Sequence, residues 1–202
     1  MALTLTDYRA DLDNILATAI DSSTWTSTIK DEALRQALQR YSLEGPVYET
    51  NFTVASANAE QDLSSITDIY RIIALAWPWS AGENFLQYSV NYRLLGNFNA
   101  YIKDGIPVVN EIIRVRYRKQ HKIQNLDSAA STTVNDVDRR TIAVAAAIWC
   151  LELRIRQLAE NPAIPDSAIT KYVNLKNRLE DEYLKRIETL IVSPVNWKTL
   201  GL

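Results

Sequence analysis

Apolar residues recur every three or four positions near both ends of the chain and alternate with polar residues in its middle. The first spacing is typical of amphipathic helices, and the second is typical of strands with one buried face. The pattern predicts two helices early in the chain, over about residues 4–19 and 27–44. Two further helices are predicted over about residues 135–160 and 165–192, separated by the helix-stopping pair Asn161-Pro162.

The middle of the chain contains short stretches with strand spacing, bounded by polar or turn-forming residues. They predict about four to six strands, over residues 48–54, 69–77, 85–93, 98–102 and 108–118. Residues 55–65 are expected to form a polar loop. Asp104-Gly105 lies between the last two stretches and predicts a hairpin turn, because both residues tolerate positive φ.

Together these elements predict an α+β fold, in which a helical bundle of about four helices carries an inserted small antiparallel β module. The bundle is expected to comprise residues 1–46 and 119–192, and the β-rich insert residues 47–118. Residues 193–202 are expected to form an extended C-terminal tail, because Pro194 ends the preceding helix.

The expected third helix is apolar on every face over residues 142–151. A helix of this kind is normally buried all round. Two interpretations are compatible with the pattern: a central helix wrapped by the other three, or a helix whose Ala-rich face packs against a neighbouring subunit. The second interpretation makes Ala143, Ala146 and Ala147 a candidate subunit seam.

Composition narrows the possible functions. The net charge is −2, so the whole chain is not expected to be drawn to nucleic acid or to an acidic membrane surface. The single cysteine, Cys150, lies in an apolar run and is expected to be a buried thiol. The N-terminus lacks the pattern of a secretory signal, and the longest apolar stretch is half a membrane span. We therefore expect a soluble protein of the cytoplasm.

No pattern in the sequence predicts catalysis, metal binding or a cofactor. His121 is the single histidine and lies among basic residues, so it is expected to be an exposed loop residue rather than a general base. One histidine and one cysteine provide no zinc-ligand spacing. The chain is accordingly predicted to have no catalytic, cofactor or metal site, and not to be an enzyme.

Basic residues form a stripe at the end of the last predicted strand. The stripe comprises Arg114, Arg116, Arg118, Lys119 and Lys122. The three arginines alternate along the chain and so share one strand face. The stripe is interpreted either as a solvated outer face of a sheet or as a surface that meets an acidic protein or a passing DNA backbone. Contact with phosphate needs only positive charge.

Two apolar clusters are candidates for contacts with other molecules. Trp77-Pro78-Trp79 lies at a strand end and is expected to be a corner of the core, or an interface anchor if it is exposed. The C-terminal tail carries apolar residues that are costly to leave in water. Either this tail folds back onto its own bundle or it docks into a partner. Its candidate contact residues are Pro194, Val195, Trp197, Leu200 and Leu202.

Three stretches give the chain a family resemblance. They are LSSITDIYRI at residues 63–72, RVRYRKQHKIQNLD at residues 114–127, and Thr132-Thr133-Val134 followed by the Ala-rich helix. Preceded by two short helices, this layout resembles the head-to-tail connector (adaptor) proteins of tailed double-stranded DNA bacteriophages. The resemblance covers about residues 5–190.

The resemblance implies a structural protein of the virion, located in the neck or connector region and assembled in the host cytoplasm. Such adaptors form homo-oligomeric rings, commonly of twelve subunits, beneath the portal and extend the DNA channel towards the tail. They have no catalytic residues. The implied partners are further copies of the chain, the portal protein, and tail or neck proteins, with non-specific contact to packaged DNA and no membrane.

In related assemblies a C-terminal tail often grips the portal, which corresponds here to residues 193–202. The residues alone leave open whether this tail binds the portal or its own ring. Two other classes of protein also remain open. One is a tail-completion or neck subunit further from the head, and the other is a DNA-associated regulatory protein that uses the basic stripe.

Overall fold

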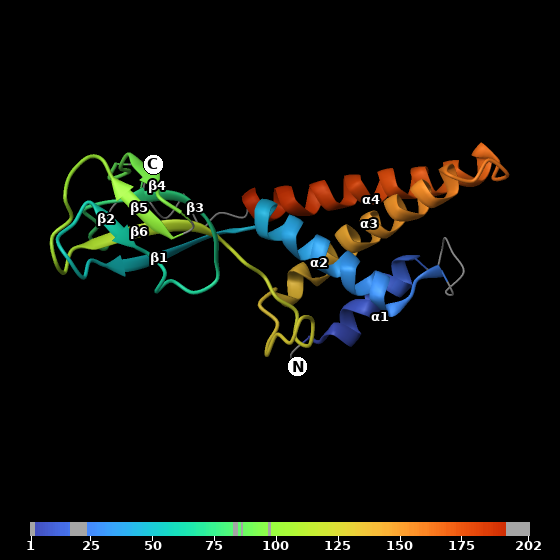
Figure 1. Ribbon diagram of the computed structural model, residues 1–202, viewed down its shortest axis with the longest axis horizontal. Coiled ribbons are helices and arrows are strands. Elements are labelled where there is room, and N and C mark those ends of the chain that lie inside the picture. Colours follow the sequence, from blue (N-terminus) through green and yellow to red (C-terminus); the bar gives the residue numbers. More distant parts are fainter. Residues whose placement is uncertain (1–2, 17–23, 83–84, 86, 97, 193–202) are drawn as a thin grey trace. The chain divides into compact units, whose positions relative to one another are not determined.

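The computed structural model describes residues 3–16, 24–82, 85, 87–96 and 98–192. The chain divides into two compact units, which we call the helical unit (residues 1–44 and 121–192) and the β unit (residues 45–120). The expected α+β fold is confirmed. Within the described residues, the helical unit has four α-helices and the β unit has two three-stranded antiparallel sheets (Figure 1).

The helical unit contains α1 (Leu5–Leu16), α2 (Ser27–Glu44), α3 (Arg139–Ala159) and α4 (Asp166–Val192), with the short 3-10 turn η2 (Asp136–Asp138) before α3. Both α2 and α4 have the bounds that the apolar spacing predicts. Helix α3 begins later than expected, because residues 136–138 form η2 before it. The end expected for the first helix lies outside the described residues.

Helix α1 begins with a cap formed by Thr4 and Asp7. The Thr4 backbone N–H donates to Asp7 Oδ2 over 2.8 Å, and the Thr4 hydroxyl donates to the same oxygen over 2.9 Å. A carboxylate in the first turn satisfies a donor that has no helical acceptor, and it interacts favourably with the helix dipole. The bond from the Thr4 backbone lowers the pKa of Asp7.

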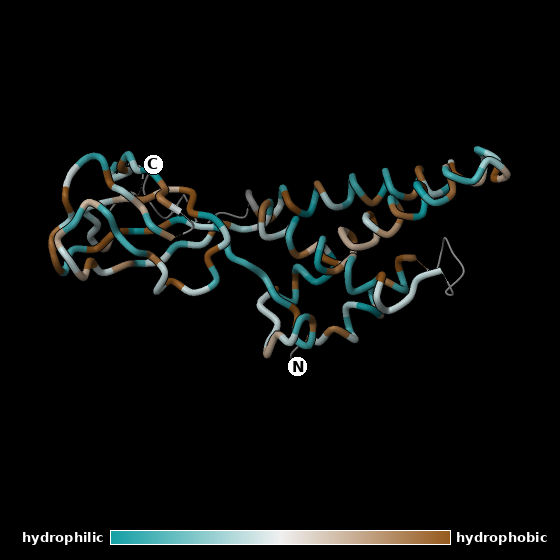
Figure 2. Tube along the Cα trace, in the orientation of Figure 1, coloured by the Kyte–Doolittle hydropathy of each residue, from teal (hydrophilic) through white to brown (hydrophobic). Residues whose placement is uncertain are grey.

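Helix α3 is the central helix of the helical unit, where it packs against α1, α2 and α4. Every residue from 141 to 148 is buried, and hydrophobic residues recur along the facing helices (Figure 2). The interpretation of a central helix that is buried all round is therefore confirmed. Small side chains on α3 allow neighbouring helices to pack closely against it.

Charged pairs join the helices at the margin of this core. Arg9 of α1 binds Asp31 of α2 with an N–O distance of 2.6 Å. Arg40 of α2 binds Glu180 of α4 over 3.0 Å, and its guanidinium lies 4.0 Å from the centroid of the Tyr183 ring. These pairs are partly exposed, so each contributes little to the free energy of unfolding but favours one helix register.

The β unit is built from two small sheets that share one core. The sheets have the strand orders β1-β6-β3 and β2-β5-β4. The core is formed by inward-facing side chains of both sheets. The strands are β1 (Val47–Thr53), β2 (Glu60–Asp62), β3 (Ile69–Ala76), β4 (Tyr92–Leu94), β5 (Asn99–Ile102) and β6 (Ile112–Lys119).

Three details of the predicted β module are wrong. The hairpin at Asp104-Gly105 does not form, because β5 and β6 belong to different sheets. The Asp104 carboxylate instead accepts the Asn91 backbone N–H over 2.6 Å. The expected loop at 55–65 contains β2, and the stretch at 85–93 contributes β4 alone. A turn dipeptide specifies local backbone geometry, whereas strand pairing is decided by which faces can be buried together.

Trp77 forms the corner of the β-unit core that its sequence predicts. It is half-buried against this core, and its indole N–H donates to the Glu111 carboxylate over 2.8 Å. The same carboxylate accepts the Val108 backbone N–H over 2.8 Å. Trp77 therefore holds the segment between β5 and β6 in one conformation.

Replacing Gly105 with alanine is expected to destabilise the β unit. The added Cβ would lie 2.8 Å from a Trp77 ring carbon, and the hydrogen bond to Glu111 keeps this ring in place. Overpacking of this kind costs about 1–3 kcal/mol. Urea unfolding checks the loss. The matched variant Ile106→Ala, at a side chain that is 62% exposed, should leave the midpoint unchanged, and equal midpoints for both variants would contradict the expectation.

Candidate functional site

His121 is buried, so the expectation of an exposed loop histidine is wrong. The residue is 5% exposed, and its ring centroid lies 4.9 Å from that of Tyr41. Its backbone N–H donates to the Ser42 hydroxyl over 3.1 Å, while the Tyr41 hydroxyl donates to Asp138 over 2.7 Å. Its basic neighbours in the sequence suggested exposure, but residues of α2 cover the His121 ring. These contacts fix the point at which the chain re-enters the helical unit.

Cys150 is a buried thiol, as predicted. It is fully buried in α3, and burial raises the pKa of its thiol to about 12. The thiolate form that reacts with electrophiles is therefore suppressed at neutral pH. Among the described residues, no group of three histidine, cysteine or acidic side chains is placed to hold a metal ion. No described helix combines the length and apolar character needed to cross a bilayer.

The first three residues of the predicted basic stripe share one strand face, as their alternation predicts. Arg114, Arg116 and Arg118 lie on one face of β6, while Ile113 and Val115 are buried on the other. On this arginine face, the three arginines are each half-buried by the same chain.

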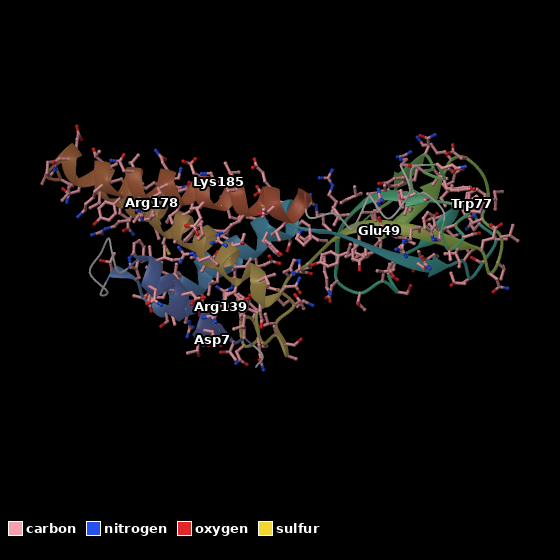
Figure 3. The ribbon with its side chains drawn as sticks, turned by 180° about the vertical axis from the view of Figure 1, so that it is seen from behind. Asp7, Glu49, Trp77, Arg139, Arg178 and Lys185 are labelled. Carbon is pink, nitrogen blue, oxygen red and sulfur yellow. The ribbon has the colours of Figure 1, made fainter. Side chains whose placement is uncertain are left out.

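A carboxylate on the neighbouring strand β1 binds two of these arginines. Glu49 contacts Arg114 over 3.2 Å and also pairs with Arg116. Arg114 donates in addition to the side-chain oxygen of Asn51 over 2.8 Å. Glu49 is labelled in Figure 3. One carboxylate between two guanidinium groups relieves their mutual repulsion.

Two aromatic rings from the segment after β3 lie over the same arginines. The Arg116 guanidinium is 3.9 Å from the centroid of the Phe85 ring, and that of Arg114 is 5.7 Å from the Trp79 ring. The side chains of Arg114 and Arg116 are 26% and 16% exposed. Both interpretations of the stripe are therefore corrected for these two residues: they form neither a solvated face nor an open surface for DNA.

The two lysines of the stripe lie in different units. Lys119 ends β6, and its Nζ atom is 3.9 Å from Asp68. Lys122 belongs to the helical unit, where its backbone N–H donates to the Thr133 hydroxyl over 2.9 Å. The strand ends between them because the chain leaves the sheet after Lys119. The five basic residues therefore do not form one face of one strand.

The candidate subunit seam is also corrected. Ala143, Ala146 and Ala147 are each 0% exposed within their own chain. Neighbouring helices of the same unit already cover the surface that a second subunit would need. The candidate tail residues Pro194, Val195, Trp197, Leu200 and Leu202 lie outside the described residues.

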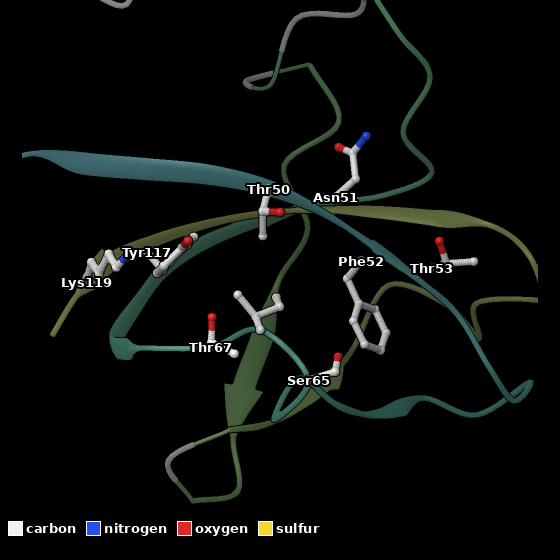
Figure 4. Close-up of a pocket in the computed structure, with 9 residues that line it drawn as sticks. Thr50, Asn51, Phe52, Thr53, Ser65, Thr67, Tyr117 and Lys119 are labelled. Atoms are coloured by element: carbon white, nitrogen blue, oxygen red, sulfur yellow. The ribbon is translucent and has the colours of Figure 1, made fainter. Parts of the chain in front are cut away.

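A shallow cleft of about 460 Å³ lies beside β1 in the β unit (Figure 4). The cleft could not be predicted from the sequence, because residues 65–67 approach β1 only through the tertiary fold. The signal that could have indicated the open edge beside it is a strand of seven residues without proline or lysine. The lining residues are Thr50, Asn51, Phe52, Thr53, Ser65, Ile66, Thr67, Tyr117 and Lys119.

The described geometry thus contains packed interiors, paired charges and a cleft beside a strand edge. This combination can bind another protein segment. No protein-family model and no curated protein matches this chain.

Proposed function

We propose that this chain is a subunit of the head-to-tail connector of a tailed double-stranded DNA bacteriophage. It forms a ring that joins the portal to the tail and extends the DNA channel. The observation that carries the proposal is the order of the two units along the chain. The β unit is inserted between α2 and α3, so that one helical unit is built from both flanking parts of the chain. This is the layout on which the resemblance to connector proteins rests.

The intrachain pairing of the arginines supports a connector over a DNA-associated regulator. A regulator that used the basic stripe would need guanidinium groups available to phosphate oxygens. Arg114 and Arg116 already bind Glu49 and lie under aromatic rings. A structural subunit needs a rigid scaffold instead, and these contacts stiffen the sheet.

The proposal places the protein in the virion, after assembly in the host cytoplasm, with the portal and a tail or neck protein as partners. It assigns no catalytic step and no cofactor. Its function depends on surfaces that hold other subunits in a fixed geometry. Preformed binding surfaces reduce the entropic cost of such contacts.

Mixing the purified protein with the portal protein encoded by the same genome tests the proposal. Rings of the chain stacked on portal rings are expected in negative-stain images, together with co-sedimentation of the two proteins. An unrelated ring protein in place of the portal is the control. A neck subunit would instead bind a tail protein and not the portal. Monomers at every salt concentration, even with the portal present, would remove the connector proposal.

A further inference from the structure

Strand β1 has one backbone edge that faces away from its sheet, and two hydrogen bonds identify the groups on that edge. The Val54 N–H donates to the Glu111 carbonyl over 2.9 Å, so Val54 turns its backbone towards the β6 side. The Ile112 carbonyl accepts the Trp79 N–H over 3.0 Å, so Ile112 turns away from β1. Ile112 lies opposite Thr53 in the strand register. Thr53 therefore points its backbone groups outward.

Backbone direction alternates along an antiparallel pair. Glu49 and Asn51 consequently point outward in the same way as Thr53. Both Asn51 and Thr53 are exposed, and within the described residues no strand pairs with this side of β1. The edge presents a row of backbone donors and acceptors to solvent.

Within the described residues, the other strand edges of the β unit are partly covered and irregular, or short. Residues 88–90 cover the C-terminal end of β3, where the Trp77 N–H donates to the Tyr88 carbonyl and the Val90 N–H to that of Leu75, and β3 has two register shifts against β6. Strands β2 and β4 have three residues each. Strand β1 has seven residues in an uninterrupted register. Native proteins usually block an edge of this length, because an open one pairs with other chains.

The cleft lies along this same edge and provides space for side chains. Its wall includes the partly buried apolar residues Phe52, Ile66 and Tyr117. Because Asn51 and Phe52 lie on opposite faces of β1 and both line the cleft, it opens at the strand edge (Figure 4). A strand bound here would hydrogen-bond the edge and insert alternate side chains into the cleft.

We propose that residues 195–202 of a second copy of this chain add to β1 as a fourth strand of the β1-β6-β3 sheet. Residues 195–202 contain no proline and are long enough to pair along all seven residues of β1. A proline inside that segment would have interrupted the ladder.

The side chains of the segment also match the two faces of the edge. Val195 and Trp197 alternate and share one strand face, while Asn196 and Lys198 share the other. With Trp197 towards the cleft, its large ring meets the apolar wall. Asn196 and Lys198 are then on the face of the exposed polar residues Asn51 and Thr53, where polar side chains can stay in solvent.

The choice of a second copy rests on the proposed ring. Contact between the tail of one subunit and the edge of the next is heterologous, and repeated heterologous contacts form a ring when their rotation closes. Fully extended, residues 193–202 span about 30 Å. The tail then binds a neighbouring subunit of the ring, whereas the resemblance implies that it binds the portal.

Cross-linking between two singly substituted chains tests the proposal. Thr53→Cys marks the edge of one chain and Lys198→Cys marks the tail of the other. Each protein then carries one accessible thiol, because Cys150 is fully buried. A short bismaleimide should join the two chains, with and without portal rings. Asn177→Cys, at an exposed position of α4, replaces Thr53→Cys as the control and should give no tail cross-link.

Substitution of Asn51 on the edge chain separates strand addition from simple proximity. Asn51→Pro removes an outward N–H without touching the ladder to β6, and Asn51→Ala loses the same side-chain bond to Arg114 but keeps the N–H. The proline variant should lower the cross-link yield about tenfold or more, whereas the alanine variant should keep it. If the proline variant does not fold, a synthetic peptide of residues 193–202 replaces it. The peptide should compete with the tail, and its N-methylated form should not.

Three results would overturn the proposal. The first is no cross-link between copies, either with or without portal rings. The others are cross-links only within one chain when a single chain carries both Thr53→Cys and Lys198→Cys, and cross-links from the tail to the portal alone. Equal yields for the Asn51→Pro and Asn51→Ala chains would exclude strand addition. Cross-links between copies in a protein that does not bind the portal would support this inference and remove the proposed function, so the two failures are distinguishable.

Discussion

Replacing Ala146 with glutamate is expected to abolish the folded helical unit. Ala146 is 0% exposed in the middle of α3, which other helices of the unit surround. A glutamate there adds volume to a close-packed core and buries a carboxylate that has no positioned partner. Losses above about 4 kcal/mol follow from such changes. A domain that is stable by only about 5–15 kcal/mol would be largely or wholly unfolded.

Circular dichroism at the helical minimum and urea unfolding measure this effect. The matched control is Gln157→Glu, which introduces the same carboxylate at an exposed position of the same helix. The control should keep the wild-type helical signal and midpoint. A folded Ala146→Glu protein with the midpoint of the control would mean that this face of α3 is open, which is what a subunit seam requires.

The helices could be predicted because their signals are local. The spacing of apolar residues predicted both bounds of α2 and α4, and the pair Asn161-Pro162 predicted the break before α4. The all-apolar stretch of α3 correctly indicated burial, but it did not say which surface provides the burial. A hydrophobic face is the same whether a neighbouring helix or a second subunit covers it. Only the packed arrangement assigned Ala143, Ala146 and Ala147 to the interior of one chain.

The β unit was less predictable, because its decisive contacts join distant residues. Alternation located β1, β3 and β6, but it could not show that β5 leaves the sheet of β6. The pairing of Glu49 with Arg114 and Arg116 joins residues 65 and 67 positions apart. The sequence does contain a signal for this pairing. Glu49 lies on one predicted strand, and the basic residues Arg114 and Arg116 lie on one face of another. Antiparallel pairing of those two strands predicts charge pairs across them.

Reversing the charge of Arg114, Arg116 and Arg118 together is expected to destabilise the β unit strongly. A solvated stripe would tolerate this change. In the structure the glutamates would surround Glu49, which is itself 23% exposed, and the contacts of Arg114 and Arg116 with Trp79 and Phe85 would be lost. Removing one partner of a largely buried pair costs about 3–5 kcal/mol. Partial exposure lowers that figure, and the added repulsion together with the lost ring contacts raises it, so we expect a loss of about 3 kcal/mol or more.

Hydrogen exchange followed by residue measures the loss in the β unit separately from the helical unit. The matched control reverses Lys171, Arg178 and Lys185 on the exposed face of α4, which changes the net charge by the same amount. Arg178 and Lys185 are labelled in Figure 3. The control should change protection in the β unit little. Adding Glu49→Arg to the β6 triple variant should restore part of the lost protection, because it places a guanidinium among the new carboxylates. Equal protection in the β6 triple variant and the α4 control would show that the pairs with Glu49 do not hold this sheet together.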